Sequence, residues 1–200
     1  MTDKEADNRQ ERLENARQLA TLFTGLSLFG GLAAATFVFI VGQDVASVEL
    51  PIGSGITAAN SIVLLNLALF LLSAVFILAW IYRAHANLCA EGDWSYEFTP
   101  GWAVGWYFIP IANLFKPFQA MKELWLGSHG RMDMRHETAP HIIWVWWIAF
   151  LFPVVTGFTS ENFAVLSEIV TLVVSSVALI ILMRDITRAQ ATMSPASVFE

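Results

Sequence analysis

Long apolar stretches alternate with short polar segments along the whole chain. Four of these stretches reach the roughly 17 to 25 residues that a transmembrane helix needs. The segments between them are polar or contain Pro and Gly. The pattern therefore predicts an all-α integral membrane protein with four transmembrane helices. The predicted spans are about 19–41, 56–82, 141–158 and 163–183.

A single domain accounts for this pattern. A polar extension at 1–16, which mixes acids with bases, precedes a membrane domain at 17–188, and a polar tail at 189–200 follows it. The first apolar run is much longer than the roughly 7 to 15 residues of a signal peptide core, so we expect it to stay attached as the first span.

A fifth apolar stretch, at about 99–116, is interrupted. A helix from Gly101 to Phe115 would be about 21 Å long at about 1.5 Å per residue, against roughly 30 Å of hydrocarbon, and Pro110 breaks even that. We expect this broken segment to be re-entrant or to lie in the membrane plane at the cytoplasmic face. Pro117 fits the first turn of a following amphipathic helix at about 117–126.

The positions of Lys and Arg predict the topology, because cytoplasmic segments of membrane proteins are rich in them. With four spans and a central segment that does not cross, all 11 Lys and Arg residues lie on the inner side. If the central segment crossed, Lys116 and every later basic residue would lie outside. Both termini are therefore expected in the cytoplasm. The eight Trp residues, whose rings favour the headgroup level, all fall near the same inner surface.

Composition narrows the class of protein further. The chain is 56% hydrophobic and 14% charged, with a mean hydropathy of +0.58, which lies outside the range of soluble globular proteins. No basic cluster is interleaved with aromatics, so a nucleic-acid partner is not expected. Cys89 is the single cysteine and excludes an internal disulfide. Motifs for metal binding, phosphate binding and nucleophilic catalysis are missing, so the sequence predicts no cofactor or metal and gives an enzyme little support.

A group of residues around the broken segment is the main candidate site. Trp80, Arg83 and Asn87 lie near one face of the second predicted span, directly before this segment. A Pro-interrupted segment at membrane depth leaves backbone groups without helical partners, which is costly in lipid. We expect nearby side chains to satisfy these groups in a structural clasp, and a ligand pocket is the alternative. The candidates are Trp80, Arg83, Asn87, Trp102, Trp106, Pro110, Asn113, Pro117, Glu123 and Trp125.

Two further sets of residues could serve other functions. Arg83, Lys116 and Lys122 supply positive charge that could contact a lipid headgroup or a small anion, although topology signals explain the same residues. Glu168 is an acid inside the last predicted span, and Thr171 and Ser175 continue its helix face. An intramembrane carboxylate suggests an ion site, while a position near the outer end favours a structural or interfacial role.

Three blocks of sequence, in order, resemble a known family. They are W-I-Y-R-A-H-A-N from Trp80, P-G-W-A-V-G-W-Y-F-I-P-I-A-N-L from Pro100, and E-L-W-L-G-S from Glu123, with Pro117 between the last two. Together they resemble the bacterial membrane proteins that carry domain of unknown function 4328. The resemblance implies a multi-pass protein of the bacterial cytoplasmic membrane, and it implies no activity or catalytic residue.

These observations favour a non-enzymatic module that acts through protein or lipid contacts at the inner membrane face. The expected partners are membrane lipids and a membrane protein or further copies of the chain. The alternative is a small oligomeric transporter or channel for an ion or small solute that uses Glu168.

Overall fold

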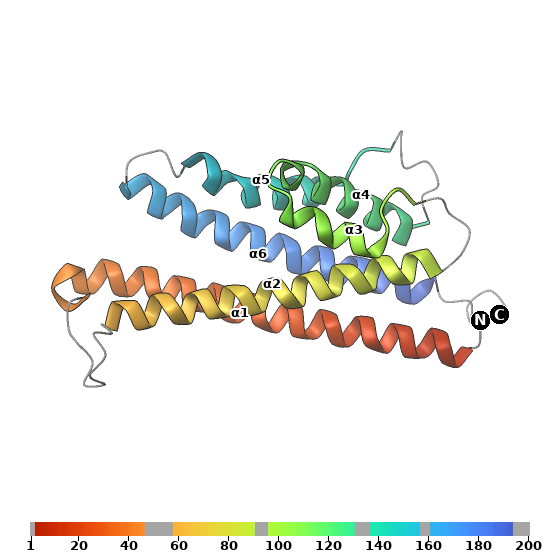
Figure 1. Cartoon of the computed structure of the whole chain (residues 1–200), viewed down its shortest axis with the longest axis horizontal. Coiled ribbons are helices and arrows are strands. Elements are labelled where there is room, and N and C mark those ends of the chain that lie inside the picture. Colours follow the sequence, from red (N-terminus) through yellow and green to blue (C-terminus); the bar gives the residue numbers. More distant parts are fainter. Residues whose placement is uncertain (1–2, 47–57, 91–95, 131–136, 157–160, 194–200) are drawn as a thin grey trace.

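The computed structural model describes residues 3–46, 58–90, 96–130, 137–156 and 161–193. This part of the chain is all α-helical and contains six α-helices, two short 3-10 helices and no strand (Figure 1). The elements are α1 Asp3–Ala46, α2 Ala58–Ala90, α3 Pro100–Gly105, η1 Trp106–Phe108, η2 Ala112–Leu114, α4 Lys116–Ser128, α5 His141–Thr156 and α6 Glu161–Thr192.

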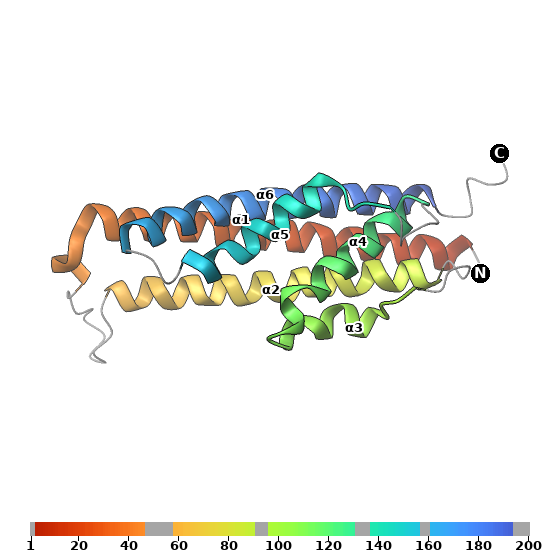
Figure 2. The same ribbon diagram turned by 90° about the horizontal axis from the view of Figure 1, so that it is seen from above.

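Three long helices form the body of the molecule. α1, α2 and α6 lie side by side along the long axis, and α3, α4 and α5 cover one side of them (Figures 1 and 2). The start of α1 and the ends of α2 and α6 lie together at one end of the bundle, which we call the terminal end. α3 and α4 cover the half nearer this end, and α5 lies over the middle of the bundle, further from this end.

The segment 96–130 forms a helical hairpin, α3 to α4, with its bend near the middle of the bundle. Thr99 begins α3, since its hydroxyl accepts the Trp102 N–H at 3.4 Å, and Pro100 occupies the first turn. Ile109 is extended before Pro110, as the residue before a proline prefers. Pro117 lies in the first turn of α4, and Gly130, with φ of 66°, follows its end. Prolines and glycine thus set the limits of the hairpin.

The described core lies mainly in the terminal half of the bundle. Trp80 of α2, Leu124 of α4 and Leu182 of α6 are fully buried there, together with Leu13 of α1. The first turns of α1 are therefore packed, and α1 runs without a break through residue 16, where the sequence predicts the polar extension to end. Leu13, Ala16 and Ala20 form its buried stripe in an otherwise charged stretch.

Two of the described helical segments are long and apolar enough to cross a membrane. They are Leu64–Ala90, with a mean hydropathy of 2.5, and Ile169–Thr192, with 2.2. The apolar part of α5, His141–Phe152, is shorter. Much of the surface of α2 is apolar, since Leu64, Phe70 and Val75 are exposed. An all-α fold with two candidate membrane-spanning helices is therefore the architecture that the described residues establish.

Candidate functional site

Glu123 of α4 holds the chain at the base of the hairpin. Its Oε2 accepts the backbone N–H of Glu97 at 2.7 Å, and its Oε1 accepts that of Phe98 at 3.0 Å. The residue is 8% exposed, and burial raises the pKa of its carboxyl above the ordinary value, although the two N–H groups favour the charged form and act against that rise. Glu123 thus satisfies two backbone donors of the segment that leads into α3.

Lys116 is bound within the protein by a second set of contacts at the hairpin. Its Nζ lies 3.2 Å from Oε1 of Glu97, and 5.2 and 5.8 Å from the ring centres of Phe98 and Trp106. These distances correspond to an ion pair and two cation–π contacts. The Lys116 charge, expected for a lipid or anion, therefore faces groups of the same chain.

Gly127 lets α4 approach α2 closely. A Cβ at this position would lie 2.8 Å from Cδ2 of Leu88 and 3.1 Å from Cε1 of Tyr96. Leu88 is almost fully buried, and Tyr96 belongs to the segment before α3. α2, α4 and the chain before α3 therefore meet at one tight point.

One face of α2, which carries Ser73, Trp80 and Asn87 at seven-residue spacing, points into the protein. Ser73 Oγ donates to the Phe23 carbonyl of α1 at 2.7 Å. Further along, Trp80 Nε1 donates to Thr187 Oγ1 at 3.3 Å, and Asn87 Nδ2 donates to Gln190 Oε1 at 3.5 Å. The face contacts α1 at one level and α6 at the next.

Gln190 joins three helices at the terminal end. Its Nε2 donates to the Ala84 carbonyl of α2 at 3.0 Å and to Ser128 Oγ of α4 at 2.9 Å. The residue is 6% exposed, so these bonds are shielded from water. A buried polar network of this kind fixes the relative positions of α2, α4 and α6.

A second link joins α4 to α6 nearer the surface. Trp125 Nε1 donates to Asp185 Oδ2 at 2.8 Å, and the His129 ring stacks on Trp125 with 4.0 Å between ring centres. His129 Nε2 lies 3.5 Å from the same Asp185 oxygen. Trp125 therefore belongs to the attachment of α4 to α6.

The bend of the hairpin exposes apolar side chains. Phe108 and Ile111 are 72% and 74% exposed, and Pro110 between them is exposed too. Trp102 and Trp106 pack on each other at 4.8 Å, with Trp102 half exposed. We call 106–115 the hairpin tip, and its exposed apolar residues are Phe108, Ile109, Ile111, Leu114 and Phe115.

The residues expected for the clasp take part in several separate contacts. Glu123, one of these candidates, satisfies two backbone N–H groups, while Arg83 is exposed on α2. Asn113 lies in η2, and its Oδ1 is buried without a hydrogen bond from the described residues. Pro117 is buried in the first turn of α4.

The other two sets of candidates do not form a described site. Lys122 is half-buried on α4, and Arg83 lies exposed on α2. The Thr171 hydroxyl donates to the Ser167 carbonyl at 2.7 Å, and that of Ser175 to Leu172 at 3.4 Å, both within α6. The side chain of Glu168 lies outside the described residues. Across the part of the chain that the structure describes, three or more potential metal ligands never gather in one group.

Family comparison agrees with the motifs that lie in this region. A family profile for the domain of unknown function (DUF4328) matches residues 52–179. The chain belongs to this family. The match covers α2, the hairpin, α5 and most of α6, so the resemblance seen in the three sequence blocks is confirmed. No curated protein and no solved structure matches the chain.

The sequence did not reveal several residues of this site. Glu97, Thr187 and Gln190 take part in the contacts described above, and Asp185 accepts the bond from Trp125. Met183, Thr187 and Gln190 follow one helical face at four- and three-residue spacing, which is the signal that marks Thr187 and Gln190. Glu97 lies in a polar connection and gives no such signal.

Proposed function

We propose that this DUF4328 protein is a four-span module of the bacterial cytoplasmic membrane, with both termini in the cytoplasm. It acts without catalysis, through lipid and protein contacts that the hairpin α3 to α4 makes at the inner face. The observation that carries the proposal is the hairpin tip, because a folded soluble surface rarely exposes two large apolar side chains, here Phe108 and Ile111, to this extent within four residues.

The lengths of the helices support a division of the bundle into two zones, one that spans the membrane and one that projects from it. α1 has 44 residues, so at about 1.5 Å per residue it is about 66 Å long, roughly twice the hydrocarbon thickness. The terminal half of the bundle then projects from the membrane, and the other half spans it. Most of the first predicted span and the first part of the last one lie in the half away from the terminal end.

The charges indicate which zone faces the cytoplasm. Arg9, Arg12 and Arg17 lie on the first turns of α1, and Arg184 and Arg188 lie near the end of α6. The bundle thus carries basic residues at its terminal end, and the positive-inside rule assigns that end to the cytoplasm. The buried Gln190 network in the same half suits a part of the protein surrounded by water.

The hairpin tip lies near mid-length of the bundle, close to the level where α5 begins (Figure 2). In the proposed orientation this level is the inner membrane surface, and the tip enters the inner leaflet from the cytoplasm. Moving Phe108 and Ile111 out of water stabilises this arrangement by about 1.5 to 3 kcal/mol per side chain. Glu123 and Gly127 hold the base of the hairpin against α2.

A depth measurement tests the proposal. A bimane fluorophore is attached to Ile111→Cys in a Cys89→Ala background, and the protein is reconstituted with lipids brominated along the acyl chain. We expect strong quenching at position 111. The matched control is the wild-type chain, with the same fluorophore on the natural Cys89, which is exposed near the end of α2. We expect no quenching there. Equal, weak quenching at both positions would show that the hairpin tip lies in water and would refute the proposal.

A further inference from the structure

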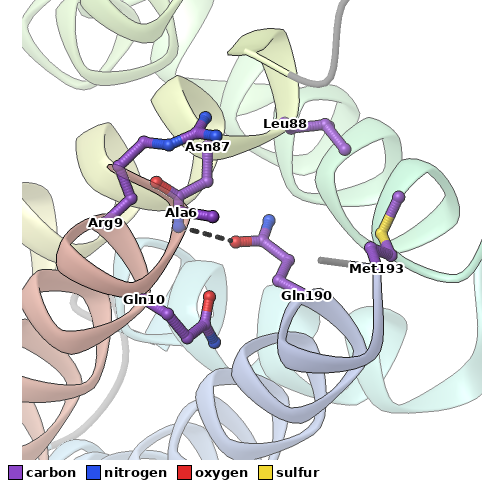
Figure 3. A pocket seen from close by; sticks show the side chains of 7 residues that line it. All are labelled: Ala6, Arg9, Gln10, Asn87, Leu88, Gln190 and Met193. Atoms are coloured by element: carbon purple, nitrogen blue, oxygen red, sulfur yellow. Dashed lines mark hydrogen bonds between the residues drawn. The ribbon is translucent and has the colours of Figure 1, made fainter. Parts of the chain in front are cut away.

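A cavity lies where α1, α2 and α6 meet at the terminal end of the bundle. It measures about 20 Å³, room for about one water-sized group, and its open mouth brings the empty space to about 340 Å³. Figure 3 shows the side chains of Arg9, Asn87 and Gln190 reaching it from the three helices. The other lining residues are Ala6, Gln10, Leu88 and Met193.

The polar wall of the cavity is held in place by bonds to the rest of the bundle. Gln190 is fixed by its two bonds to Ala84 and Ser128, and its Oε1 accepts from Asn87. Gln10 Nε2 donates to the Thr187 carbonyl at 3.3 Å. A ligand that enters finds these amides already oriented, which reduces the entropy lost on binding.

The charges of the wall determine which ligand it suits. The described lining residues include one cation, Arg9, and three amides, but no carboxylate. A guanidinium offers several N–H donors in a plane that matches the oxygens of phosphate and carboxylate groups. Asn87 donates one amide N–H to Gln190 and has a second N–H to offer.

We propose that this cavity binds an oxyanion, the phosphate or carboxylate group of a small molecule, with Arg9 supplying the charge and Asn87 a further donor. The narrow part admits about one water-sized group, so the remainder of the ligand lies in the mouth. Arg9 precedes the first predicted span by ten residues, or about 15 Å of helix. In the topology proposed above, an anion dissolved in the cytosol is therefore the nearer source.

Calorimetric titration of the full chain in a neutral detergent tests this site, with inorganic phosphate as the probe at constant ionic strength. We expect saturable binding that weakens at least tenfold in Arg9→Gln. Arg12→Gln removes an exposed charge from the same helix, outside the cavity, and should bind as the wild type does. Glu5→Gln removes a carboxylate four residues before Arg9 and should strengthen binding.

A second variant and a competition experiment with lipids complete the test. Gln10→Glu places a carboxylate in the lining at almost constant size and should abolish phosphate binding, which keeps the proposal testable if Arg9→Gln fails to fold. In lipid nanodiscs, displacement of phosphate by phosphatidylglycerol, but not phosphatidylcholine, would identify a lipid headgroup as the occupant of the same oxyanion site. Absence of saturable phosphate binding, or equal losses in Arg9→Gln and Arg12→Gln, would overturn the proposal. Neither result depends on the depth of the hairpin tip.

Discussion

The carboxylate of Glu123 in α4 accepts the backbone N–H of Phe98, which lies 25 residues earlier and just before α3. The same carboxylate accepts the N–H of Glu97. One side chain therefore closes the base of the hairpin and fixes where α3 begins relative to α4.

Glu123→Ala should lower the unfolding temperature in detergent. It leaves two backbone N–H groups without their acceptor, and an unsatisfied buried donor costs about 1 to 3 kcal/mol. Glu14→Ala on the exposed face of α1 is the control and should change stability by less than about 0.5 kcal/mol. Equal unfolding temperatures for the two variants would show that the Glu123 contacts add no stability.

Stability should also depend on pH through Glu123. Because burial raises the pKa of this carboxyl, the folded protein binds its proton more tightly than the unfolded chain does. The protonated Glu123 carboxyl therefore adds to the free energy of unfolding. This contribution is complete below the ordinary Glu pKa of about 4.3 and is lost as pH rises through the raised pKa of the folded state. In Glu123→Gln, urea unfolding measured across this range should lose that part of the pH dependence. An unchanged profile would assign the dependence to other carboxyls.

Gly127→Ala should destabilise the contact between α2 and α4. The added methyl would come within 3 Å of the buried Leu88 side chain, and overpacking of this kind costs about 1 to 3 kcal/mol. Gly101→Ala is the matched control, since a Cβ there meets no atom within 4 Å, and thermal unfolding should show no loss of stability. Because Ala forms helices more readily than Gly, propensity alone would stabilise both variants, so a similar loss in both would contradict the close packing at position 127.

A double-mutant cycle should detect the bond between Trp125 and Asp185. We expect a coupling of about 0.5 to 1.5 kcal/mol between Trp125→Phe, which removes the indole N–H donor, and Asp185→Asn, which replaces the carboxylate acceptor by a neutral amide. The free energy of unfolding of the four proteins gives this value. Additive effects would indicate that water replaces the bond at no cost.

Local rules predicted the backbone of the hairpin better than its contacts. Pro110 and Pro117 interrupt the helical pattern, and the structure bends and restarts there. The acceptor role of Glu123 depends on a chain segment 26 residues away, which no local periodicity reports. Leu13, Ala16 and Ala20 escaped notice because the charged residues between them hide a buried stripe from a hydropathy average.

The central claim is that the hairpin enters the membrane from the cytoplasm and returns to the same side. Labelling with a membrane-impermeant maleimide in intact cells tests it at two exposed positions, the natural Cys89 before the hairpin and Thr138→Cys after it, the latter in a Cys89→Ala background. Ser54→Cys in the same background, in the predicted external loop, is the control for access from outside. We predict that positions 89 and 138 are protected in intact cells and react once the membrane is opened, while position 54 reacts in both. Reaction of Thr138→Cys in intact cells, with Cys89 protected, would place positions 89 and 138 on opposite sides of the membrane and contradict the account.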